Sequence, residues 1–191
     1  MSSQPTPFLT CEQYLDAERK AEFRSEYVDG QMYAMSGVSW EHGRITLNVT
    51  KLLDDQLADT PCEVRASDQR VRPRTGGPYY YPDVVVVCGS PQFEDQEFDT
   101  LLNAKVIVEV LSPSTESYDR GTKFDRYRQM PSLAEYLRIS QTRVHIEHRL
   151  LSPGGEWKST ETSDLNGVLE LPSIGARLKV ADIYHRVRFG S

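Results

Sequence analysis

Two short segments of the chain are apolar at every position. Residues 84–87 are four consecutive valines, and residues 106–108 read Val-Ile-Val. A strand that alternates apolar and polar side chains has one face in water, whereas these two segments are apolar on both faces. They therefore predict two central strands of a sheet that is covered on each side.

The N-terminal part of the chain predicts a short helix followed by a β-hairpin. Thr10 and Gln13 have the spacing of a capping box, in which the two side chains and two backbone N–H groups pair reciprocally at a helix start. Residues 24–28 and 31–35 flank Asp29-Gly30. That dipeptide is typical of a type I′ turn, because both central positions of the turn have positive φ.

A second, longer helix is predicted after Ser39, which is a favourable N-cap residue. The apolar positions that follow keep helical spacing: Ile45, Val49, Leu52, Leu53 and Leu57. Such spacing places one apolar stripe on the helix, and that stripe is expected to pack against a sheet.

The remaining segments predict further short elements. Strands are expected within 63–74 around a bend, at 135–139 and at 144–149, with a hairpin turn at 152–155 and short strands and loops up to 184. Residues 112–115 can cap a helix that begins near Glu116. It should run to about Gln129, because Pro131 disfavours helical backbone just before it. The predicted fold is α/β (α+β), one domain over residues 1–191 with a mixed central sheet, flanking helices and extra β-hairpins.

Composition is ordinary for a soluble globular protein, with 38% hydrophobic and 26% charged residues in 191. The first residues lack the basic and apolar regions of a signal peptide, and the longest apolar run is far too short to span a bilayer. Three cysteines without a CxxC pair indicate a reducing, intracellular setting. We therefore expect a cytoplasmic protein without a membrane partner.

The net charge of −6 argues against broad, high-affinity binding to a phosphate backbone. Basic residues are nevertheless concentrated in two stretches, Arg65, Arg70, Arg72 and Arg74, and Arg120, Lys123, Arg126 and Arg128. These stretches can face an anionic ligand or simply be solvated strand and helix faces, and composition does not decide between the two.

Each predicted central strand carries one carboxylate. Asp83 opens the first strand after Pro82, and Glu109 lies inside the second. An ionised carboxylate buried without a partner costs several kcal/mol, so a cation or strong hydrogen bonds must compensate it. If the strands are neighbours, the two acids can meet at one end of the sheet, where hard oxygen ligands suit Mg²⁺ or Mn²⁺. Alternatively, either acid alone is an edge residue or the partner of an arginine.

A string of motifs carries a family resemblance. It comprises Tyr81-Pro82-Asp83 before the valines, residues 108–115, Asp119…Lys123…Tyr127 and Glu135-Tyr136-Leu137, with residues 26–30, His42 and Ser67-Asp68 upstream. In this order the motifs resemble the Uma-type restriction endonuclease family of the PD-(D/E)XK nuclease superfamily. The resemblance covers nearly the whole chain.

The resemblance implies acidic residues that bind a divalent metal, Mg²⁺ or Mn²⁺, for hydrolysis of phosphodiester bonds in DNA. Asp83 corresponds to the PD aspartate and Glu109 to the second acid, with the Val110 carbonyl as a further metal ligand. The lysine expected two residues after Glu109 is replaced by Leu111. Lys123, on the following helix, is the natural substitute, unless it merely pairs with Asp119 on a wet surface.

Three residues are expected to support this site: Glu26, His42 and Asp119. The resemblance also implies a homodimer or higher homo-oligomer that cuts DNA. Two alternatives stay open: a catalytically inactive nuclease-fold module for binding or structure, and a phosphodiesterase acting on RNA or nucleotides. Neither a GxSxG elbow nor a Walker phosphate loop occurs in the sequence.

Overall fold

A computed structural model describes residues 8–112 and 122–189. The elements are α1 (Cys11–Glu18), β1 (Ser25–Val28), β2 (Gln31–Ala34), α2 (Trp40–Leu57), β3 (Cys62–Ala66), β4 (Arg70–Val71), β5 (Val84–Cys88), β6 (Thr100–Leu101), β7 (Val106–Leu111), α4 (Phe124–Tyr127), β8 (Glu135–Ser140), β9 (Ile146–Leu151), β10 (Trp157–Thr162), β11 (Val168–Leu171), β12 (Ala176–Lys179) and α5 (Val180–Ile183). Within the described ranges, no helix combines the length and the apolar character needed to cross a membrane.

A six-stranded mixed sheet forms the centre of the molecule, in the order β10-β9-β8-β7-β5-β3. Strands β7 and β8 are parallel, and every other neighbouring pair in this sheet is antiparallel. The two all-apolar segments of the sequence are the adjacent strands β5 and β7, with Val84 opposite Val108. The predicted fold class, with a mixed central sheet, is therefore confirmed.

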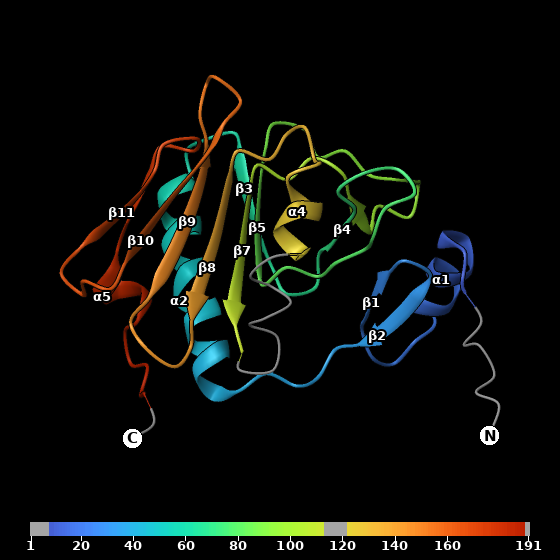
Figure 1. Ribbon diagram of the computed structural model, residues 1–191, viewed down its shortest axis with the longest axis horizontal. Coiled ribbons are helices and arrows are strands. Elements are labelled where there is room, and N and C mark those ends of the chain that lie inside the picture. The colour runs from blue at the N-terminus through green and yellow to red at the C-terminus, as the bar shows by residue number, and fades with distance from the viewer. Residues whose placement is uncertain (1–7, 113–121, 190–191) are drawn as a thin grey trace.

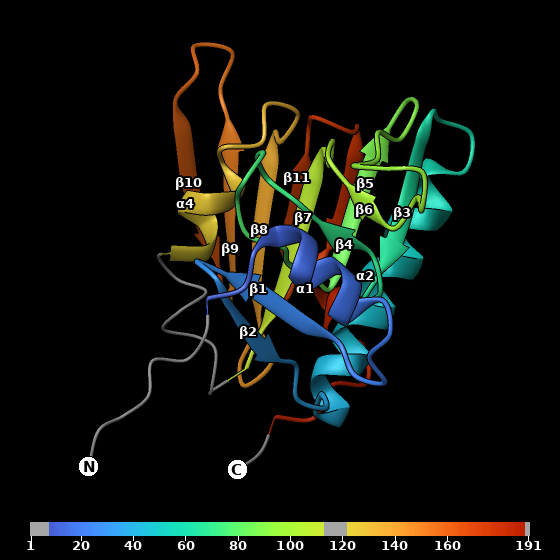
Figure 2. The same cartoon turned by 90° about the vertical axis from the view of Figure 1, so that its right-hand side faces the viewer.

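The sheet is covered on both faces, which explains why its central strands are apolar throughout. Figures 1 and 2 show α2, α5 and β11 on one side of the sheet, and α4, β4 and the β1–β2 hairpin on the other. Because side chains alternate along a strand, Val84 and Val86 pack in the cluster that contains the α2 stripe. Val85 and Val87 pack on the opposite face with tyrosines and α4.

Several local predictions from the sequence are confirmed. Thr10 and Gln13 form the capping box of α1. The turn between β1 and β2 has Asp29 at φ 49° and Gly30 at φ 86°, the backbone conformation that the Asp-Gly dipeptide predicted. Ser39 caps α2 by accepting a hydrogen bond from the His42 N–H. The α2 stripe is buried, and only Leu52 in it is partly exposed.

Other segments differ from the predictions. The last part of the chain was expected to form only short strands and loops, but residues 180–183 form the helix α5. Val180 and Ile183 lie one turn apart there and are both buried in the core. Strand β9 begins at Ile146 rather than at residue 144, and α4 ends at Tyr127 rather than near Gln129. The predicted helix start near Glu116 lies outside the described residues.

Two cysteines form a disulfide that no local sequence pattern predicted. Cys62 opens β3 and Cys88 closes β5, and the antiparallel register places them directly opposite each other. Cys11 is the free thiol. The cysteine pattern had indicated a reducing setting, in which a disulfide is not expected. The register of β3 and β5 nevertheless brings Cys62 and Cys88 within bonding distance.

A cluster of ion pairs around the buried Arg70 connects the N-terminal helix to the short strands β4 and β6. The guanidinium of Arg70 lies 2.7 Å from Asp99, and Arg19 donates two hydrogen bonds to the same carboxylate. Burial opposes ionisation of Asp99, but the hydrogen bond from Arg19 and the charge of Arg70 hold its pKa well below the usual value. Arg70, which belongs to the first basic stretch, therefore forms an ion pair inside the protein and is not on a solvated face.

Asp99→Asn is expected to lower the free energy of unfolding by about 1–3 kcal/mol at pH 7, because the buried Arg70 loses its counter-charge. The folded-state pKa of Asp99 is depressed, so this stabilisation is present above the unfolded pKa of about 3.9 and is lost as the pH falls through the folded value. Urea denaturation at neutral and acidic pH measures both effects. Asp55→Asn is the control, because the Lys51–Asp55 pair is largely exposed, and it should change stability by at most about 0.5 kcal/mol. Equal effects of the two substitutions would contradict the prediction.

Candidate functional site

A cavity of about 680 Å³ lies at the end of the central sheet where β7 ends and β5 begins. Residues 33–39 line it as the chain passes from β2 to α2 below this end of the sheet (Figure 1). Six residues singled out from the sequence line it as well: Glu26, His42, Asp83, Glu109, Val110 and Lys123. Asp119 lies outside the described residues. The structure thus brings six residues from distant parts of the sequence around one cavity.

Asp83 is held between the sheet and α2. One of its oxygens, Oδ2, accepts a hydrogen bond of 2.7 Å from the backbone N–H of Val110 in β7. The other oxygen, Oδ1, lies 2.6 Å from Nε2 of His42 in the first turn of α2. The carboxylate is therefore fixed by two contacts that both depend on the tertiary fold.

Glu109 is the buried acid of β7, with an exposed fraction of 4%. The hydroxyl of Tyr127, in α4, donates a 2.9 Å hydrogen bond to Glu109 Oε1. Burial and the nearby carboxylates of Glu109 and Glu26 raise the pKa of Tyr127 well above its usual value. The phenol is therefore protonated at neutral pH and remains a hydrogen-bond donor.

Lys123 lies between two carboxylates. Its Nζ is 3.0 Å from Glu26 Oε1 and 3.0 Å from Glu109 Oε1, and the residue is only 6% exposed. The ring of Tyr80 lies 5.3 Å from the same ammonium group, within the range of a cation–π contact. The alternative in which Lys123 occupies a wet surface is therefore wrong.

Glu26 reaches the cavity from β1. The backbone N–H of Tyr81, just before β5, donates to Glu26 Oε1 at 3.3 Å. The bridge between Tyr27 and Tyr79 fixes the hairpin against this part of the chain. The β1–β2 hairpin thus adds a third carboxylate to the two that come from the sheet.

The charges at this cavity suit a divalent cation. Glu26, Asp83 and Glu109 carry three negative charges, and Lys123 balances one of them. A carboxylate offers about four lone-pair positions, so the contacts described leave coordination capacity on these oxygens. Hard oxygen donors with residual negative charge are what Mg²⁺ and Mn²⁺ require. Val110 contributes its N–H to Asp83, and a role for its carbonyl stays a prediction.

Two residues at the site were not assigned to it from the sequence. Tyr127 lies four residues after Lys123, and this helical spacing could have identified it as a partner of Glu109. Gln141, which follows β8, accepts a 2.5 Å hydrogen bond from the Ser39 hydroxyl at the start of α2. No local pattern signals that contact, because it joins residues 102 positions apart.

The fold is shared with a protein of known structure. The crystal structure titled "a putative nuclease belonging to DUF820" from Anabaena variabilis superimposes with a TM-score of 0.76 over 92% of this chain and 97% of that chain. The sequences are only 14% identical, so this likeness shows the fold.

The sequence itself defines the family. The profile of the family described as "Putative restriction endonuclease" (Uma2) matches residues 11–181. The chain belongs to this family.

Two proteins of Synechocystis sp. are similar over most of their length. "Uncharacterized protein sll1609" is 35% identical over 165 residues, which cover 86% of this chain and 93% of the relative. "Uncharacterized protein slr1290" is 38% identical over 189 residues, covering 98% and 97%. Family and fold together support a nuclease-like function.

Tyr127→Phe is expected to lower the free energy of unfolding by about 1.5–3 kcal/mol, because a buried carboxylate loses a charge-assisted hydrogen bond. Tyr33→Phe is the matched control, since Tyr33 is 53% exposed and bonds only to Gln31 among the described contacts. Its effect should stay within about 0.5 kcal/mol. Denaturant titration of both variants measures the difference, and an unchanged stability of Tyr127→Phe would argue against the described hydrogen bond.

Proposed function

We propose that this protein is a divalent-metal-dependent endonuclease that hydrolyses phosphodiester bonds in DNA. One observation carries the proposal: Asp83, directly before β5, and Glu109, in the neighbouring strand β7, line a cavity that also contains the buried Lys123. Membership of a restriction endonuclease family supports the reaction class. Families of this kind generally use divalent metals, and the donors at the cavity are of the matching type.

In this proposal Asp83 and Glu109 hold Mg²⁺ or Mn²⁺, with the Val110 carbonyl as a further ligand. When bound, such a cation lowers the pKa of a coordinated water and offsets negative charge on the phosphate. Glu26 is the nearest additional acid, because it shares Lys123 with Glu109. It supports the cation directly or through water.

Lys123 takes the role of the lysine that is missing at Leu111. Its ammonium group belongs to the helical segment after β7 but lies 3.0 Å from the β7 acid. A positive charge at this position stabilises the negative charge that develops on a phosphate during attack by water. The two neighbouring carboxylates hold the ammonium group in place.

His42 and Tyr127 are positioning residues in this scheme. His42 contacts one oxygen of Asp83, and Tyr127 donates to one oxygen of Glu109. Hydrogen bonds to a ligating carboxylate fix its orientation, so that its remaining lone pairs point toward the cation.

The net charge of the protein makes the cation important for substrate binding too. A chain with net charge −6 repels the phosphate backbone at long range. A divalent cation in the cavity reverses the local sign, so DNA binding by this protein is expected to depend on metal as strongly as cleavage does.

The proposal predicts cleavage of supercoiled plasmid DNA in Mg²⁺ or Mn²⁺ but not in EDTA. Asp83→Asn and Glu109→Gln should reduce cleavage to the level seen in EDTA, because each substitution removes a ligand charge while keeping the side-chain shape. Lys123→Met should lower the rate by about 10²–10³-fold, the usual effect of losing one charge-stabilising group. Gel electrophoresis of the products measures all three variants.

Glu63→Gln is the control, because Glu63 is an exposed acid on β3 that pairs with Arg65. It should cleave like the wild-type protein, and circular dichroism should show that all variants are folded. Full activity of Asp83→Asn or Glu109→Gln would refute the proposed site. Parallel assays on single-stranded DNA, RNA and a small phosphodiester distinguish the proposal from a phosphodiesterase with another substrate. Absence of cleavage together with absence of metal binding would identify an inactive module.

A homodimer is part of the proposal, because two copies of one active site are the simplest means of cutting both strands. Sedimentation equilibrium at micromolar concentration is expected to give twice the chain mass of 21.8 kDa. A monomer that only nicks the plasmid would refute the dimer and leave the proposed active site intact.

A further inference from the structure

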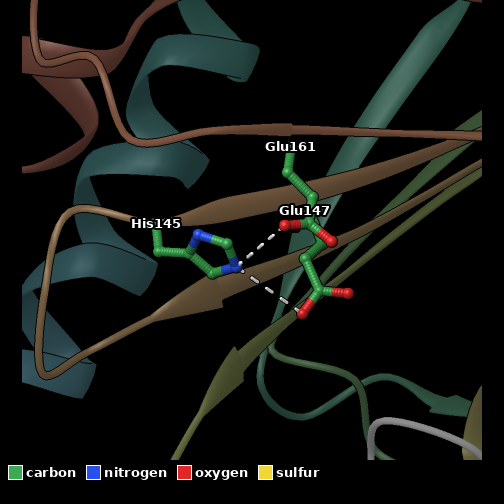
Figure 3. A group of neighbouring side chains, drawn as sticks. All are labelled: His145, Glu147 and Glu161. Carbon is green, nitrogen blue, oxygen red and sulfur yellow. Dashed lines mark ion pairs between the residues drawn. The ribbon is translucent and has the colours of Figure 1, made fainter.

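A second group of metal-ligand side chains lies on the outer strands of the sheet, away from the candidate active site. His145 lies just before β9, Glu147 lies on β9 and Glu161 lies on β10. Their side chains point toward one another (Figure 3). One nitrogen and two carboxylate oxygens lie within 4.8 Å of one another. Strand β8 separates β9 from β7, which carries Glu109, so this group is distinct from the cavity described above.

Strand register produces the grouping. Glu147 and Glu161 are directly opposite in the antiparallel pair β9–β10, and His145 lies two residues before Glu147 on the same face. Like charges directly opposite each other destabilise a sheet. Two carboxylates at such a position therefore create a local demand for positive charge.

The distances around His145 differ from those of the other histidine–carboxylate pairs in the described chain. His42 lies 2.6 Å from Asp83, and His148 lies 2.6 Å from Glu135. In contrast, Nε2 of His145 is 3.7 Å from Glu147 and 3.8 Å from Glu161. The first two distances are direct hydrogen bonds, whereas the last two are too long for one.

These longer distances suit a bound cation. Ligands placed tetrahedrally at about 2.0–2.2 Å from zinc are separated by roughly 3.3–3.6 Å. The two separations from His145 Nε2, 3.7 and 3.8 Å, exceed this range by only a few tenths of an ångström. Because Glu161 is an exposed side chain at 60%, it can close that difference by a small rotation.

Neighbouring groups orient two of the three ligands. Nδ1 of His145 lies 3.3 Å from the hydroxyl of Ser163, a contact that directs the other ring nitrogen toward the two carboxylates. Arg138, on β8, is paired with Oε2 of Glu147, and Oε1 is the oxygen near His145. Such outer contacts are typical of metal ligands, because they fix the tautomer of a histidine and the orientation of a carboxylate.

We propose that His145, Glu147 and Glu161 bind one Zn²⁺ ion, with water as the fourth ligand. A histidine nitrogen with two carboxylate oxygens is a ligand set for zinc, whereas the all-oxygen acids at Asp83 and Glu109 suit Mg²⁺. The ion joins the edge strand β10 to β9 and neutralises the opposed carboxylates, so it stabilises the outer part of the sheet.

Isothermal titration with Zn²⁺ tests the site in the full chain carrying Asp83→Asn and Glu109→Gln, which removes the two acids proposed to hold Mg²⁺. This protein should bind one equivalent. Adding His145→Ala or Glu161→Gln should weaken binding at least about tenfold, the lower limit for loss of even an outer partner of a metal ligand. His185→Ala is the control, since that histidine is exposed and remote from the three ligands in sequence, and it should leave binding unchanged.

Thermal unfolding provides a second readout. Zn²⁺ should raise the Tm of the protein carrying Asp83→Asn and Glu109→Gln, with or without His185→Ala, but not once His145→Ala or Glu161→Gln is added, because only a ligand that binds the folded state stabilises it. The proposal is overturned if the protein lacking Asp83 and Glu109 binds no zinc, or if His145→Ala and Glu161→Gln bind it as tightly as their parent. Because Glu161 is exposed, its substitution is not expected to prevent folding.

Discussion

The buried contact of Lys123 with Glu26 and Glu109 is the interaction on which the site depends. It joins three separate parts of the molecule, namely the β1–β2 hairpin, the central strand β7 and the segment that leads into α4. Burying any of these charges alone costs several kcal/mol, so each is stable only because the others are present. The β1–β2 hairpin lies outside the six-stranded sheet, and this contact connects it to the end of β7 that borders the cavity.

This constraint also explains why a glutamate lies within an otherwise apolar strand. The face of β7 that carries Glu109 also carries Ile107, which packs in a core cluster with Tyr127 and Tyr80. The two tyrosines serve both environments, since their rings fill the core while the Tyr127 hydroxyl reaches Glu109 and the Tyr80 ring contacts Lys123. The core and the polar cavity are therefore continuous, and a change in one is transmitted to the other.

Local patterns predicted the elements, and the tertiary contacts had to come from the structure. The Asp-Gly dipeptide predicted the hairpin, the cap and helical spacing predicted α2, and the uninterrupted apolar runs predicted the two valine-rich strands, because these features depend on neighbours in sequence. They placed one acid at each of these strands, but the adjacency of the strands, which brings Asp83 and Glu109 to one cavity, came from the sheet order. In contrast, the pairing of Cys62 with Cys88 depends on register, and the role of Glu26 depends on where a hairpin docks. The basic stretches were ambiguous for the same reason, because Arg70 is used inside the fold.

Charge along one row of the sheet relates the two groups of acids. In register across the strands, Glu109 is opposite Arg138, Arg138 is opposite Glu147, and Glu147 is opposite Glu161. Signs alternate along the first three positions, so Arg138 compensates the inner acids. The alternation ends at the pair of β9 and β10, where two negative charges meet without a basic residue at the next register position. A row that is balanced internally and unbalanced at its edge attracts a cation at that edge, and His145 places a ring nitrogen beside the two carboxylates there.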